Sequence, residues 1–153
     1  QQPVASDLRA TRAVARVALE LERVGDESKK IARFAAKAGA ASEHDPVGAV
    51  ARYLRHMAGL STTMLRSAVR ALDEASPALA REVLARDKEL DAEFATAIRQ
   101  LMSFVMQDHQ FLRATVDTIF ALKGLERIGD HAKNISEQVL YMVEGERPGK
   151  KGA

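Results

Sequence analysis

The sequence predicts an all-α protein that folds as an antiparallel helix bundle, and three observations predict it. The 153 residues include only 9 Gly, 4 Pro and 5% aromatic residues. Apolar residues recur every three or four positions over long segments, which is the period of an amphipathic helix. The pairs Asp45-Pro46 and Ser76-Pro77 separate these segments, and each reads as an N-cap followed by a first-turn proline.

The first helix is expected to run unbroken from the first residues to about Ala38, with Gly39 as a C-terminal cap. Its apolar stripe comprises Val14, Val17, Leu21, Val24, Ser28, Ile31 and Ala35. A loop over 40–46 leads to a second helix that ends near Leu72. The buried side of that helix comprises Val50, Leu54, Met57, Met64 and Leu65.

Two further helices complete the prediction. Ser76 opens a third helix that ends near Met106, with a stripe of Val83, Leu90, Phe94, Ala97 and Leu101. Asp108 is expected to cap a fourth helix from His109 to about Val143. Its stripe comprises Thr118, Ala121, Leu125, Ile128, Ala132, Ile135 and Val139.

Composition narrows the classes of function. The 23 basic and 21 acidic residues give a net charge of +2, too small to indicate nucleic-acid binding. The chain has no cysteine, which excludes a disulfide framework and a thiolate metal site. No apolar run approaches the length of a membrane span, so we expect no membrane insertion.

An eleven-residue segment occurs twice. Residues 21–31 read LERVGDESKKI and residues 125–135 read LERIGDHAKNI, with seven identical positions at an offset of 104 residues. Such self-similarity indicates a duplicated structural unit. Each copy holds a Glu and an Asp four residues apart and a mid-helix Gly, both of which cost helix stability. Because the paired acids lower helix stability in both copies, we expect them to have a function. For Gly25 and Gly129, close packing of helices is the favoured explanation.

The repeat also predicts the domain organisation. Residues 46–145 form one complete three-helix unit, and residues 1–39 form the closing helix of a preceding unit. We therefore expect two partner helices before residue 1. The apolar stripe of the first helix would then lack a cover in this chain, which predicts a homo-oligomer. The basic tail, 146–153, is expected to be flexible.

Three acid pairs are candidate metal ligands: Glu22 with Asp26, Asp87 with Asp91, and Glu126 with Asp130. At about 100° per residue, each pair lies at the rim of its helix's apolar stripe. Two rims can face each other across packed helices, and carboxylates crowded in this way repel unless a cation lies among them. The alternative is that these acids decorate a solvated face and pair with Lys29, Lys30 and Lys133.

Oxygen ligands without thiolates suit Mg²⁺, Ca²⁺, Mn²⁺ or iron. Asn134 lies four residues after Asp130 and could add an amide oxygen. His131, one residue off that face, could add an imidazole and favour transition metals.

The run LERIGDHAKNISE, Leu125 to Glu137, resembles the signature of the PhoU family of bacterial phosphate-transport regulators. The earlier run LERVGDESKKIA resembles that family's first copy, and the opening QPVASDLR resembles the segment before it. The resemblance covers 1–144 and implies a fold of two similar three-helix bundles. This chain then corresponds to the third through sixth helices of that fold.

The resemblance also implies a function. Family members carry acid motifs that bind iron, zinc or other metal clusters. Carried over, the candidates are Asp87, Asp91, Glu126 and Asp130, with Asn134 beside them. Glu22 and Asp26 belong to the first unit, whose partner acids are absent from this chain.

The family resemblance further implies a cytoplasmic, commonly dimeric adaptor without catalytic activity. Such an adaptor represses the phosphate-starvation response by bridging the ATPase of the phosphate ABC transporter and a sensor histidine kinase. Two rival interpretations are a metal-dependent carboxylate-site enzyme and a purely structural helical scaffold. Such an enzyme usually carries Glu-x-x-His pairs, and none occurs in the sequence.

Overall fold

The structure, a computed structural model, describes residues 2–38 and 44–145. Within these residues it is an antiparallel bundle of long helices without a strand, as the sequence predicted. The elements are α1 (Gln2–Ala38), α2 (Pro46–Ala49), α3 (Ala51–Asp73), α4 (Pro77–Gln107), the 3₁₀ turn η1 (His109–Phe111) and α5 (Leu112–Glu144). Gly39 and the tail 146–153 lie outside the described residues.

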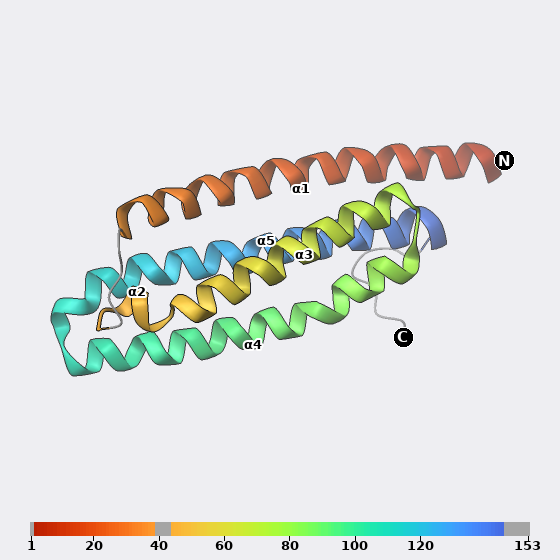
Figure 1. Cartoon of the computed structure of the whole chain (residues 1–153). Coiled ribbons are helices and arrows are strands. Elements are labelled where there is room, and N and C mark those ends of the chain that lie inside the picture. Colours follow the sequence, from red (N-terminus) through yellow and green to blue (C-terminus); the bar gives the residue numbers. More distant parts are fainter. Residues whose placement is uncertain (1, 39–43, 146–153) are drawn as a thin grey trace.

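Helix α5 is the central element of the bundle. It packs against α1 on one side and against α3 and α4 on the other. Figure 1 shows α1 and α4 running antiparallel to α5, while α3 runs parallel to it. None of the helices in the described residues has the length and hydropathy that crossing a membrane requires. The assignment of α1 to a preceding repeat stays a prediction.

The core lies between α3, α4 and α5. Its largest fully buried side chains include Met57, Met64, Leu90, Leu101, Leu122 and Ile135. A smaller apolar cluster closes the end where α3 meets α4, with Ala71, Ala80, Val139 and Leu140. The predicted stripe of α5 is buried at all seven positions. The predicted stripes of α3 and α4 are buried or half-buried throughout.

The predicted capping residues Asp45 and Ser76 cap their helices. Two predicted helices are each split into two elements, α2 and α3 in one case and η1 and α5 in the other. Asp45 accepts a hydrogen bond from the Gly48 amide at 2.8 Å, and the Ser76 hydroxyl accepts one from the Leu79 amide at 3.4 Å. The second predicted helix breaks at Val50, where φ is −105° and ψ is 9°. The fourth begins as the η1 turn, because the Asp108 carboxylate accepts a hydrogen bond from the Gln110 amide at 2.9 Å.

The buried face of α1 differs from the prediction. Val17 and Val24 are buried, but Val14 and Leu21 are 55% and 40% exposed. The positions that face α5 step by three and four through Ala13, Val17, Glu20, Val24, Glu27, Ile31 and Phe34. This is the heptad spacing of a coiled-coil seam, shifted from the predicted stripe by one position in alternate turns. The prediction was wrong at Val14, Leu21, Ser28 and Ala35, which are exposed, because the residue before each of them faces α5 instead: Ala13, Glu20, Glu27 and Phe34.

Candidate functional site

Four of the predicted site residues lie on the packed helices α4 and α5, close enough for their carboxylates to influence one another electrostatically. Asp87 and Asp91 extend from α4, and Glu126 and Asp130 extend from α5. The pKa of Asp91 is raised by its burial and then by the charges of Asp87 and Glu126. The pKa of Asp130 is raised by its burial and then by the charge of Glu126, with a smaller contribution from Asp87. We call these four residues the carboxylate seam.

Two lysines of α5 partly neutralise the carboxylate seam. The Lys133 ammonium donates a hydrogen bond to Asp87 Oδ2 at 2.6 Å. This bond, together with the nearby carboxylates, raises the pKa of Lys133 although partial burial opposes the shift. Lys123 forms an ion pair with Glu126 one turn along the helix. Four carboxylates therefore face two ammonium groups, and the seam keeps an excess of negative charge.

Asp87 is the most deeply placed member of the seam. Only 9% of the residue is exposed, and its Oδ1 is buried without a hydrogen-bond partner among the described residues. Asp91 and Asp130 make no hydrogen bond or ion pair within residues 2–38 and 44–145. A buried acceptor left unpaired is costly, and a third positive charge at the seam would relieve it.

The chemistry of this donor set fits a hard or borderline cation, because all of its donors are carboxylate oxygens. Its present arrangement is not a finished ligand shell. Among the described residues, no three His, Asp or Glu side chains form a group that could hold one metal ion. The ammonium groups of Lys123 and Lys133 already contact Glu126 and Asp87, so a metal ion bound by either of these acids would compete with a lysine.

The other predicted site residues lie elsewhere. Asn134 faces α1 and donates a hydrogen bond from Nδ2 to Glu20 Oε2 at 3.1 Å. His131 Nδ1 lies 2.6 Å from the same oxygen. Glu22 and Asp26 are exposed on α1, and Asp26 pairs with Lys29 at 3.3 Å. The alternative in which these acids pair with nearby lysines therefore describes Asp26 with Lys29, and it also describes the pairing of Asp87 with Lys133.

The contact between α1 and α5 is polar to a degree that the sequence analysis missed. Glu27 is 8% exposed and pairs with Lys30 at 2.8 Å and with Arg127 at 3.6 Å. One heptad earlier, Glu20 meets His131 and Asn134. The sequence did contain evidence for this polar contact. Glu20 and Glu27 continue the three-and-four spacing of Val17, Val24 and Ile31, so they lie on the same face of the helix. Buried glutamates at such positions require partners on the facing helix.

The two glycines of the repeated segment have different surroundings. A Cβ atom added at Gly129 would lie 2.2 Å from Leu90 Cδ2, so the Leu90 side chain of α4 packs directly over a position that lacks a side chain. A Cβ at Gly25 would meet nothing within 4 Å. Close packing therefore explains Gly129 and does not explain Gly25. A third glycine, Gly124, lies beneath Ile31 where α1 crosses α5.

The fold and the seam define a helix-bundle protein whose acidic residues lie along the contact between two helices. Residues 54–139 match the PhoU domain. A relative from Pseudomonas putida is 41% identical over 145 residues, which is 95% of this chain and 56% of the relative. A relative from Rhizobium meliloti is 38% identical over 149 residues, 97% of this chain and 61% of the relative. Both are named phosphate-specific transport system accessory protein PhoU homolog.

The crystal structure of PhoU from Pseudomonas aeruginosa superposes with a TM-score of 0.84 at 37% identity, over 95% of this chain and 68% of that one. The chain belongs to the PhoU family. It spans somewhat more than half the length of the curated relatives that it matches.

Proposed function

We propose that this protein is a metal-binding accessory protein of a phosphate transport system that represses phosphate uptake and the phosphate-starvation response. It would act in the cytoplasm as a homodimeric adaptor between the transporter ATPase and a sensor histidine kinase. The observation that carries the proposal is membership of the PhoU family, with relatives named as transport accessory proteins along 95% of this chain. The resemblance in the repeated segments supports the regulatory partners.

The carboxylate seam supports the metal-binding part of the proposal. Asp87, Asp91, Glu126 and Asp130 would hold the metal, which could be iron, zinc, manganese or magnesium. When bound, the ion supplies positive charge that neutralises the crowded carboxylates. The protein's own contribution is to fix two carboxylates on each of two rigid, closely packed helices. Catalysis is not part of this proposal, because the seam presents no nucleophile paired with a general base.

Metal content tests the seam directly. The purified protein is analysed for bound metals by mass spectrometry, beside the double variant Asp91→Ala/Asp130→Ala. We expect the variant to lose the metal while its helical circular dichroism is unchanged. The matched control is Glu22→Ala/Asp26→Ala, which removes an equally spaced acid pair from the exposed face of α1. Equal metal content in both variants would exclude the seam as the binding site.

Repression tests the regulatory part separately. The chain is expressed in a bacterial strain that lacks its own PhoU protein, and a reporter of the starvation response is measured in phosphate-rich medium. We expect the reporter to be repressed. A folded, stably expressed chain that leaves the reporter at its starved level would argue for the structural scaffold, or for an activity that needs more than this chain.

A further inference from the structure

Lys133 lies within reach of acids from both helices of the carboxylate seam. It follows Asp130 by three residues, so the two side chains share one face of α5. From that face its ammonium group reaches α4 and donates a hydrogen bond to Asp87 Oδ2 at 2.6 Å. The Lys133 side chain is 34% exposed, so its charged end can leave Asp87 for water while the helices stay packed.

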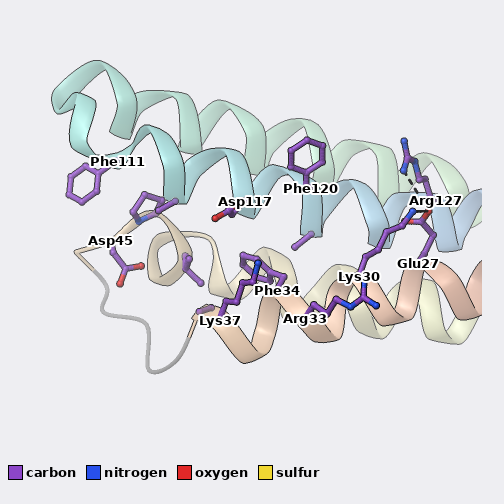
Figure 2. A pocket seen from close by; sticks show the side chains of 15 residues that line it. Glu27, Lys30, Arg33, Phe34, Lys37, Asp45, Phe111, Asp117, Phe120 and Arg127 are labelled. Carbon is purple, nitrogen blue, oxygen red and sulfur yellow. Dashed lines mark hydrogen bonds and ion pairs between the residues drawn. The ribbon is translucent and has the colours of Figure 1, made fainter.

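Asp87 is neutralised less completely than the other buried acid. Glu27 and Asp87 are the two acidic residues that are buried in the part of the chain that the structure describes. Glu27 is engaged by two cations, Lys30 at 2.8 Å and Arg127 at 3.6 Å, and Figure 2 shows both beside it. Asp87 is engaged by Lys133 alone, and its Oδ1 is buried without a hydrogen-bond partner among residues 2–38 and 44–145. Asp87 is therefore a carboxylate that can accept further positive charge.

The charge of Lys133 acts on three of the four carboxylates. The pKa of Lys133 is raised first by its hydrogen bond to Asp87 and then by the charges of Asp87, Asp130 and Asp91, while burial opposes the rise. Burial raises the pKa of Asp91 and of Asp130, and Lys133 opposes that rise at both acids more than Lys123 does. At these three acids, Lys133 already supplies part of the positive charge that a bound cation would supply.

Lys123 contacts the seam at its edge. It pairs with Glu126 one turn along the same helix, and its ammonium group lies 5.3 Å from the centre of the Phe94 ring. Ion pairs at this spacing on a helix surface contribute little to stability. Releasing Glu126 from Lys123 should therefore cost less than releasing Asp87 from the bond that Lys133 makes between two helices.

We propose that the Lys133 ammonium group is a built-in competitor for the cation site of the carboxylate seam, and that Lys133 must release Asp87 before the seam binds a divalent cation. Lys133 then sets the affinity of the site, because binding costs the protein a hydrogen bond between two charged groups. The alternative is that Lys133 only ties α5 to α4, and in that case its removal would lower stability without tightening cation binding. This inference rests on the metal-binding part of the proposed function, and it names the residue that regulates that site.

Affinity for Mn²⁺, a divalent ion that suits oxygen ligands, measures the competition. Wild-type protein and Lys133→Met are titrated with Mn²⁺ after chelator treatment, and free Mn²⁺ is followed by electron paramagnetic resonance. We expect Lys133→Met to bind Mn²⁺ at least tenfold more tightly. Tenfold corresponds to about 1.4 kcal/mol, and a hydrogen bond between charged groups is worth at least that much. Lys133→Arg keeps the positive charge and should stay within about threefold of the wild type.

Three further variants control for charge and for the place of binding. Lys88→Met removes an exposed lysine that follows Asp87 in the sequence and forms no ion pair within the described residues, so it should leave the affinity within about twofold. Lys123→Met should tighten binding by less than Lys133→Met does. Adding Asp91→Ala/Asp130→Ala to Lys133→Met should abolish the gain, because it removes carboxylates of the seam.

Thermal melts with and without saturating Mn²⁺ provide the second measurement. Because a ligand stabilises the folded state in proportion to the logarithm of its affinity, Mn²⁺ should raise the melting temperature of Lys133→Met more than that of the wild type. The same melts show whether Lys133→Met is folded at the temperature of the titration. If it is not, Lys133→Gln keeps a hydrogen-bond donor for Asp87 without the charge and takes its place.

The outcomes separate the competition from metal binding itself. If the wild type binds Mn²⁺ and Lys133→Met binds it no more tightly, or if Lys88→Met gains as much, the competition is wrong while metal binding at the seam stands. Binding by Lys133→Met alone would support the competition and count against metal binding by the wild-type protein. If neither protein binds Mn²⁺, the metal-binding part of the proposed function fails and the competition fails with it.

Discussion

The two glycines of the repeated segment provide a matched experiment on helix packing. Gly25 and Gly129 occupy the same position of an almost identical segment, and both lie inside long helices. Replacing either with alanine removes the helix penalty of glycine, which is worth about 1 kcal/mol. Only at Gly129 does the new methyl group meet another helix.

The size of the change in the free energy of unfolding follows from what surrounds each glycine. At Gly25 nothing lies within 4 Å of the added Cβ, so Gly25→Ala should raise the free energy of unfolding by about 1 kcal/mol. At Gly129 the Cβ would lie 2.2 Å from Leu90 Cδ2, and Leu90 is fully buried, so its displacement disturbs the core. Overpacking of this kind costs about 1–3 kcal/mol. The net effect of Gly129→Ala is then a loss of up to about 2 kcal/mol.

The assay is urea denaturation of the two variants and the wild type, followed by circular dichroism. Because the propensity gain is common to both variants, the difference between them isolates the packing cost, about 1–3 kcal/mol in favour of Gly25→Ala. Equal stabilisation by both substitutions would refute the close approach of α4 and α5 at Gly129. Destabilisation by Gly25→Ala would refute the open environment assigned to that position.

Three further predictions concern the charged seam and α1. Lys133→Met should lower the free energy of unfolding by about 1–3 kcal/mol, because it leaves Asp87 buried without its ion-pair partner. Adding Asp87→Asn should recover part of that loss. A double-mutant cycle measured by urea denaturation checks both expectations. The raised pKa values of Asp91 and Asp130 mean that the folded state binds protons more tightly there than the unfolded state, so their ionised forms oppose folding. In metal-free buffer, Asp91→Asn/Asp130→Asn should therefore be more stable than the wild type near pH 7, and thermal melts should show that advantage shrinking as the pH falls through the two raised values. Hydrogen exchange by mass spectrometry should be faster in α1 than in α3 or α4, because α1 packs mainly against a single helix; equal protection would contradict this reasoning.

The helices could be predicted from the sequence because their signals are local. The caps at Asp45 and Ser76 fix where α2 and α4 begin, and the three-to-four spacing of apolar residues fixes which faces α3, α4 and α5 bury. The break at Val50 and the η1 turn were missed. Each is a change within a single turn, and propensity and periodicity do not resolve changes of that length.

The register of α1 could not be predicted from apolar periodicity alone. Glu27 is buried and Glu20 is half-buried, and their respective partners Arg127 and His131 lie more than 90 residues away in the chain. Such pairing depends on which helix packs opposite, so it becomes visible only in the tertiary structure. The heptad spacing that includes both glutamates was nevertheless present in the sequence.

The carboxylate seam was predictable in outline because helix geometry places Asp87, Asp91, Glu126 and Asp130 on facing rims. Lys133 was named as a pairing partner for these acids, but its choice of Asp87 on the neighbouring helix could not be specified, since a long flexible side chain can select among several acids. The orientation of Asn134 toward α1 depends on Glu20, which the seam prediction did not include. Whether the seam holds a metal stays a prediction.

The position of α5 links the carboxylate seam to the contact with α1. One helix supplies Glu126 and Asp130 to the seam and, within a single turn of them, Arg127 and His131 to the contact with α1. Neighbouring residues lie about 100° apart around a helix, so a rotation of α5 about its axis would shift the side chains of both sets together.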